Sequence, residues 1–258
     1  MLINCKDSHI RSNYLVHKYN ELIASGAKKE NILVITLNAY KKSLFQKAVQ
    51  SANVYTFQGL CYNAFLENKE YISSLTNDTN PEVKPNLCGL EISQFIFKQS
   101  IKEANFSDYI SKVNLLHQLF RRYSLIVQND LSNQEISKRS KILNETFYLD
   151  AQKAIDDYKS KTIQYKSYDY LRQMAILPLI YKNTDYFKNI EYLLVDDADE
   201  FSYAFWQFVE AIMPQLKDYY IAYDKDGSSR CGYLCAYKSG IEEFKKIMIS
   251  KKQILIAN

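Results

Sequence analysis

The sequence predicts an α/β fold in which an open, mostly parallel sheet is flanked by helices and interrupted by an all-helical segment. Short apolar runs bounded by polar residues, such as 32–36 and 190–195, are typical of strands buried on both faces. Helical patterns separate these runs, which indicates right-handed strand–helix–strand crossovers. From residue 91 to 177 only helical patterning occurs, so we expect a helical insertion there.

The first part of the chain has the alternating rhythm of such a fold. A helix over residues 11–26 ends at Gly26, a residue type suited to a C-terminal cap. The following elements are predicted as a strand at 31–36, a helix at 39–50, a strand at 53–57 and a helix at 59–68.

The rhythm breaks at LTNDTNPEVKPN (residues 75–86), where polar residues and two prolines predict a boundary loop. It resumes with a strand at 190–195, a helix with apolar residues at i, i+3, i+4 and i+7 that stops before Pro214, and a strand at 219–223. We therefore predict a split α/β domain (1–74 and 178–258) and an inserted helical subdomain (75–177).

Composition excludes several classes of protein. No apolar run approaches the ~20 residues of a membrane span, and the first ten residues do not resemble a secretory signal peptide. The five cysteines are scattered without a CxxC pair, so neither a disulfide framework nor a zinc site is predicted. A cytoplasmic protein without a membrane partner is expected. The net charge of +4 fits either polyanion contact or a solvated basic face.

Polar side chains follow the predicted strands, and LLVDDADEF (193–201) is the densest such cluster. Ligands of open α/β sheets bind beyond the carboxyl ends of the strands. The hydroxyls and carboxylates at these ends (5–12, 36–38, 56–58, 196–197 and 224) therefore suit a magnesium-bound phosphate. Asp196 would hold the metal through water, and Asp197 could polarise an attacking water. A solvated loop with an acidic helix cap is an equally supported alternative.

The order of motifs resembles the first motor lobe of UvrD/Rep-type superfamily 1 DNA helicases, over nearly the whole chain. LVDDADE (194–200) is similar to the family's Val-Asp-Glu-x-Gln-Asp, and YDKDGS (223–228) to Gly-Asp-Pro-x-Gln-Ser. Two of the family's DNA-contact motifs are similar to ILVIT (32–36) and VYTFQGL (54–60), respectively. The family's Asp-Phe-Asp-Asp-Leu is similar to YDYL (168–171). ILIAN (254–258) resembles the strand that enters the second lobe. The resemblance implies a RecA-like P-loop NTPase fold, with Mg²⁺ and ATP as cofactors.

The resemblance also locates departures from an active nucleotide site. The stretch CKDSHIRS (5–12) stands where G-x-x-x-x-G-K-[ST] belongs, and both glycines are replaced. Arg11 replaces the lysine, Asp7 adds a negative charge, and Ser12 keeps its type as a magnesium ligand. Asp197 replaces the catalytic glutamate with a shorter side chain, and Asp199 and Gly227 replace glutamines. Arg11, Ser12 and Asp224 are thus a degenerate nucleotide site, with Ser12 and Asp196 at the metal positions.

The resemblance assigns Thr36, Thr56 and Phe57 to DNA contact, with Phe57 packing in the core as the alternative. The leading hypothesis is a DNA-associated lobe with a decayed ATP site, acting in a larger protein or with a second motor lobe or a partner protein on single-stranded or junction DNA. An active ATP-dependent helicase and a protein-interaction scaffold that binds neither ligand are the alternatives.

Overall fold

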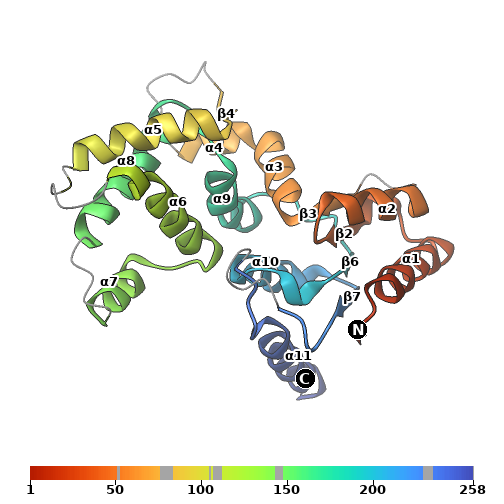
Figure 1. Cartoon of the computed structure of the whole chain (residues 1–258). Coiled ribbons are helices and arrows are strands. Elements are labelled where there is room, and N and C mark those ends of the chain that lie inside the picture. The colour runs from red at the N-terminus through yellow and green to blue at the C-terminus, as the bar shows by residue number, and fades with distance from the viewer. Residues whose placement is uncertain are drawn as a thin grey trace. The chain divides into compact units, whose positions relative to one another are not determined.

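The computed structural model describes residues 1–50, 53–75, 84–104, 106, 112–142, 148–228 and 235–257, with side chains up to residue 248 in the last helix. The chain forms two compact units (Figure 1). One contains Met1–Leu60 and Pro178–Asn258, and the other Cys61–Leu177. The later boundary coincides with the predicted one, whereas the earlier boundary falls after Leu60 rather than after residue 74.

The first unit is built on a five-stranded sheet in which every neighbouring pair is parallel. Its order is β1-β7-β6-β2-β3. The predicted parallel sheet flanked by helices is therefore confirmed. The strands are β1 (Leu2–Asn4), β2 (Ile32–Thr36), β3 (Val54–Thr56), β6 (Tyr192–Val195) and β7 (Asp218–Tyr223).

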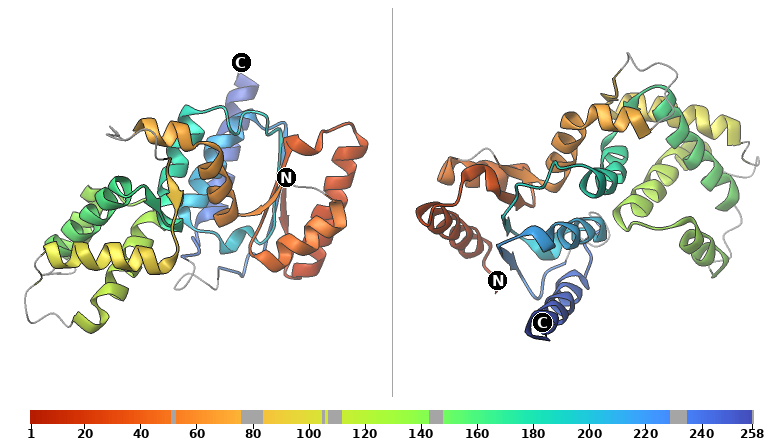
Figure 2. Two further views of the ribbon diagram at one scale, coloured as in Figure 1. Left: turned by 90° about the horizontal axis from the view of Figure 1, so that it is seen from above. Right: turned by 180° about the vertical axis from the view of Figure 1, so that it is seen from behind.

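Helices cover both faces of this sheet (Figure 2). Alternate residues of β2, Ile32 and Val34, join Leu15 and Phe45 in the core between the sheet and the first two helices. Helix α10 lies on the opposite face of the sheet, and its Phe205 and Phe208 are buried. These helices are α1 (Ser8–Ala24), α2 (Ala39–Val49) and α10 (Tyr203–Ile212), followed in the chain by α11 (Gly240–Ala257), with 3-10 turns at Lys29–Asn31, Ala198–Glu200 and Met213–Gln215.

The cap predicted at Gly26 is confirmed. Gly26 has φ +97°, and its N–H donates to the carbonyl of Ile23 while the N–H of Ala27 donates to that of Leu22. This pair of bonds satisfies two of the last carbonyls of α1, as in a Schellman motif. The backbone at this position needs the left-handed conformation that glycine adopts without strain.

The strand predicted at 254–258 is wrong, because α11 continues to Ala257. Its buried residues Ile241 and Phe244 are three apart, the spacing of one face of a helix. The apolar run at the end of the chain is short and extends that helix instead of starting a strand.

The second unit is mainly helical and has a separate core that includes Phe97, Leu119 and Tyr158. The all-helical prediction is wrong in one detail, because β4 (Asn86–Leu87) pairs in parallel with β5 (Ser167–Tyr168). Phe65 lies 5.1 Å from Tyr168, ring centre to ring centre, which places the end of α3 with this unit. The helices are α3 (Phe57–Glu67) and α9 (Tyr170–Asn183), which both cross a unit boundary, and α4 (Lys69–Leu75), α5 (Leu90–Ala104), α6 (Lys112–Gln128), α7 (Asn133–Ile142) and α8 (Tyr148–Gln164).

Most of the predicted boundary loop, residues 76–83, lies outside the described residues. Within the described part of the chain, no helix is long and apolar enough to cross a membrane.

Candidate functional site

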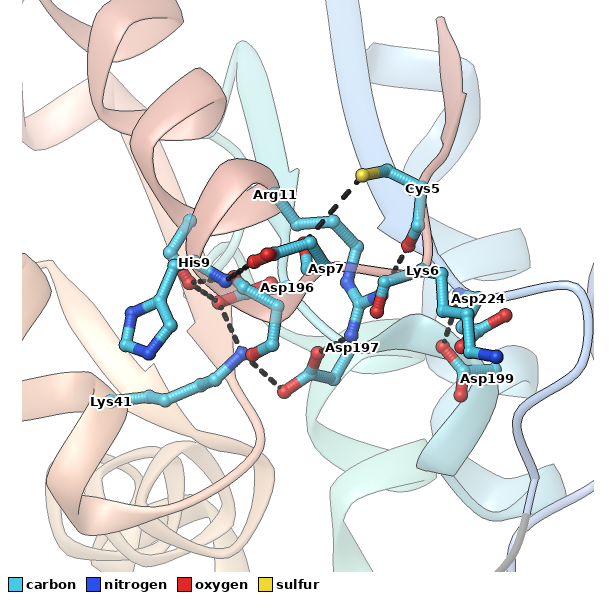
Figure 3. Close-up of polar contacts among 12 residues, drawn as sticks. Cys5, Lys6, Asp7, His9, Arg11, Lys41, Asp196, Asp197, Asp199 and Asp224 are labelled. Carbon is cyan, nitrogen blue, oxygen red and sulfur yellow. Dashed lines mark hydrogen bonds and ion pairs between the residues drawn. The ribbon is translucent and has the colours of Figure 1, made fainter.

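The carboxyl ends of β1, β6 and β7 meet at one edge of the sheet, because the three strands are parallel neighbours. The loops that leave them carry the predicted nucleotide-site residues. Figure 3 shows that side chains from these loops and from the start of α2 converge there. The sequence therefore predicted which segments meet at this edge, and the side-chain contacts described below show which groups are bonded to one another there.

The segment predicted to be a degenerate phosphate loop (5–12) caps the helix that follows it. Asp7 precedes α1, and its carboxylate accepts hydrogen bonds from the backbone N–H groups of His9 (2.8 Å) and Ile10 (3.1 Å). These bonds hold the pKa of Asp7 below its usual value. Free N–H groups at a helix N-terminus are what bind a phosphate. Here an internal carboxylate already accepts from two of them.

Arg11, predicted to replace the lysine of a phosphate loop, forms a buried ion pair. Its Nη2 lies 2.5 Å from Oδ1 of Asp197, and the two side chains are each 7% exposed. Its Nη1 donates to the backbone carbonyls of Cys5 and Lys6. Burial disfavours the charged guanidinium, but the hydrogen bond and charge of Asp197 raise the pKa of Arg11 above its usual value. Arg11 therefore ties the loop at 5–7 to the acidic motif.

Asp196, which is 1% exposed, is held by a serine and a lysine. The Oγ of Ser12 donates to its Oδ2 at 2.5 Å, and the Nζ of Lys41 lies 3.0 Å from the same oxygen. Lys41 also lies 2.5 Å from Oδ2 of Asp197. Burial and then the charge of Asp197 raise the pKa of Asp196, while Lys41 and Ser12 oppose that shift. Two cations, Arg11 and Lys41, thus face two carboxylates.

The other acids of this edge organise the loop after β7. The carboxylate of Asp199 accepts from the N–H groups of Asp224 (2.9 Å) and Ser228 (3.3 Å). Burial is the main cause that raises the pKa of Asp199. A Cβ on Gly227 would come within 1.9 Å of Oδ2 of Asp199, so the loop needs glycine there. Asp224 accepts from the N–H of Asp226 (2.9 Å) and has no described bond to Arg11 or Ser12.

The residues predicted to contact DNA are engaged within the protein. Thr36 is fully buried, and its Oγ1 faces the carbonyls of Asn38 and Tyr55 at 3.4 Å. The Oγ1 of Thr56 accepts from the N–H of Gly59 (3.0 Å), in the first turn of α3.

Phe57 is 6% exposed and packs against aromatic rings of α10. Its ring centre lies 5.3 Å from that of Phe205 and 6.2 Å from that of Phe208. In this conformation the ring is a core residue, as the packing alternative predicts, and it is not presented for stacking on a base.

The residues present do not fit a magnesium-bound nucleoside triphosphate in this arrangement. The helix N–H groups bind Asp7, the cation at the lysine position binds Asp197, and an ammonium bridges the two carboxylates that would face the metal. Among the described residues, no group of three or more His, Cys, Asp or Glu side chains could hold a metal ion.

Sequence reasoning missed Lys41. It lies 155 positions from Asp196 and carries no motif of its own. One signal could have found it. Lys41 lies in the first turn of the helix that follows β2, and β6, whose end carries the two acids, is a neighbour of β2 in the sheet.

No protein-family model matches the chain, and a search of curated proteins finds no match.

Proposed function

We propose that this chain is a helicase-like motor lobe of the UvrD/Rep type whose nucleotide pocket is replaced by internal ion pairs. It would serve as a non-hydrolysing, DNA-associated part of a larger protein or complex. The observation that carries this proposal is the buried pair of Arg11 and Asp197, which joins the position of the phosphate-loop lysine to that of the catalytic base.

The order of the strands supports the motor-lobe part of the proposal. β7 lies between β1, which leads into the loop at 5–12, and β6, which leads into the acidic motif. The acidic motif and the degenerate loop then meet at the same edge, as the resemblance implies.

The ion pairs support the non-hydrolysing part. A triphosphate would have to displace Asp7 from the start of α1 and break Arg11 from Asp197, leaving a buried carboxylate with Lys41 alone. Removing one partner of a buried pair costs several kcal/mol. The bonds to Arg11 and Lys41 also occupy both oxygens of Asp197, which a general base needs free for water.

A titration with a fluorescent ATP analogue and Mg²⁺ tests this proposal against an active helicase. We expect no saturable binding in the micromolar range. Saturable micromolar binding that is lost in both Ser12→Ala and Asp196→Ala would establish an Mg-ATP binding site and refute the replacement of the nucleotide pocket by ion pairs.

The burial of Thr36 and Phe57 favours a second candidate, a protein-interaction scaffold without DNA binding. Binding of a labelled single-stranded oligonucleotide, measured by anisotropy at rising salt, separates the two. A DNA-associated motor lobe should bind the oligonucleotide at low salt, and its affinity should fall steeply as salt rises, because phosphate contacts release counterions. No binding at low salt would support the scaffold.

A further inference from the structure

Lys41 occupies a position where a lysine is unfavourable by itself. It lies in the first turn of α2, where its N–H donates to the side chain of the capping residue Asn38 at 3.0 Å. The positive end of the helix dipole disfavours a cation in this turn. Only 15% of the side chain is exposed, so water does little to offset that cost. The lysine therefore needs an anionic partner inside the protein.

Two carboxylates meet this need. The Nζ of Lys41 lies 3.0 Å from Asp196 and 2.5 Å from Asp197, and it touches the Oδ2 atom of each. Arg11 takes the remaining oxygen of Asp197. The four side chains together carry two positive and two negative charges, so the cluster is balanced without any added ion.

Asp196 shows how much this balance depends on Lys41. Its Oδ1 is buried and has no hydrogen-bond partner, and its other contacts are the neutral hydroxyl of Ser12 and the ammonium of Lys41. A buried carboxylate costs several kcal/mol unless a cation offsets it. Arg11 bonds to Asp197 and not to Asp196. Lys41 is thus the one cation in contact with Asp196 among the described side chains.

We infer that Lys41 is a built-in counter-ion for Asp196 and Asp197, which makes this pair of carboxylates independent of a divalent metal ion. The ammonium bridges one oxygen of each acid, the place from which a metal would contact both. A divalent ion there would meet the ammonium at contact distance, so the two exclude each other. This inference rests on the ion-pair geometry and does not depend on the helicase resemblance.

The inference predicts that metal dependence appears when Lys41 is removed. In the full chain, Lys41→Met leaves Ser12, Asp196 and Asp197 facing one another with only Arg11 to balance them. We expect the thermal midpoint in EDTA to fall by roughly 5–10 °C. Millimolar Mn²⁺ should restore at least half of that loss, because carboxylate and hydroxyl oxygens are ligands that it accepts.

The fluorescence of Trp206, the single tryptophan, reports the α/β unit during these melts. Lys47→Met is the matched control, since it removes an exposed lysine from the same helix. The control should lose only the small stabilisation of a cation in the last turn of α2, well below the loss in Lys41→Met. The midpoints of the control and of the wild type should each be the same in EDTA and in Mn²⁺. Lys41→Met combined with Asp196→Asn should lose the Mn²⁺ effect, which would assign that effect to this cluster.

Three results would overturn the inference: a midpoint of Lys41→Met equal to that of Lys47→Met, a wild type stabilised by Mn²⁺, or a destabilised Lys41→Met that Mn²⁺ does not rescue. If Lys41→Met does not fold in EDTA, its refolding yield from urea with and without Mn²⁺ gives the same decision. None of these readouts involves nucleotide or DNA, so the outcome is separable from that of the proposed function.

Discussion

Replacing Arg11 by methionine tests whether the ion pair across the sheet edge holds the α/β unit together. Methionine keeps most of the aliphatic volume but removes the guanidinium from Asp197 and from the carbonyls of Cys5 and Lys6. The two carbonyls lie at the partly exposed start of the loop, where water can reach them. Asp197, in contrast, is buried and keeps Lys41 as its remaining cationic contact among the described side chains.

The size of the effect follows from these contacts. Losing the charge-assisted bond to Asp197 costs about 2 kcal/mol, and the two carbonyl bonds add about 1 kcal/mol between them. The loss stays at the lower end of the ~3–5 kcal/mol that follows when a buried charge loses its partner, because Lys41 remains beside Asp197. We therefore expect Arg11→Met to lower the free energy of unfolding by about 3 kcal/mol.

Urea denaturation followed by Trp206 fluorescence measures this loss, with Lys6→Met as a control because the Lys6 side chain is exposed. A double-mutant cycle of Arg11→Met with Asp197→Asn should give a coupling energy of about 2 kcal/mol. If Arg11→Met stays within about 0.5 kcal/mol of Lys6→Met, the pair does not stabilise the unit and the reasoning fails.

Three further predictions concern the two units. Burial raises the pKa of Asp169, whose carboxylate accepts a hydrogen bond from the hydroxyl of Tyr158. The native state therefore binds the proton of Asp169 more tightly than the unfolded state does. The free energy of unfolding should then fall as pH rises from the usual Asp pKa of 3.8 to the raised pKa. Urea melts of Asp169→Asn should lack that fall, and an unchanged pH profile would contradict this. Gly240→Ala would place a Cβ 2.1 Å from Nε1 of Trp206. It should lower the free energy of unfolding by about 1–3 kcal/mol, measured in melts followed by circular dichroism. An unchanged free energy would show that the contact relaxes freely. Gly26→Ala adds only backbone strain at φ +97°, because no atom lies within 4 Å of the new Cβ. We expect the free energy of unfolding to fall by about 1 kcal/mol in the same melts. A loss as large as that of Gly240→Ala would contradict a purely local effect.

The strands and the convergence of their ends could be predicted from sequence because both follow from local pattern. The apolar runs at β2 and β6 have the length and flanks of buried strands, and all five residues of β2 are buried. Parallel strands then place Ser12 beside Asp196, although the two are 184 positions apart. Comparison with the phosphate-loop motif also marked Asp7 as a negative charge that departs from the family pattern, and Asp7 caps α1.

The partners of the acids could not be predicted, because they depend on side-chain directions that only the packed fold determines. Nothing in the local sequence singled out Lys41 as a partner of Asp196 and Asp197. The exchange of a strand for a helix at the end of the chain has a different cause. The apolar run at 254–257 is too short to distinguish the helical period from the strand period, and the helix that buries Ile241 and Phe244 continues to Ala257.

The backbone N–H groups of His9 and Ile10, at the start of α1, are bonded to the carboxylate of Asp7 and are therefore not free to bind a phosphate. Amide NMR signals of these two residues, recorded during a titration with Mg-ATP, show whether a phosphate displaces that carboxylate. We expect neither signal to shift as Mg-ATP is added at neutral pH, and both to shift at acid pH when Asp7 becomes protonated. Saturable shifts of both signals with Mg-ATP would show that a phosphate displaces Asp7, and the proposed loss of the nucleotide pocket would then be wrong.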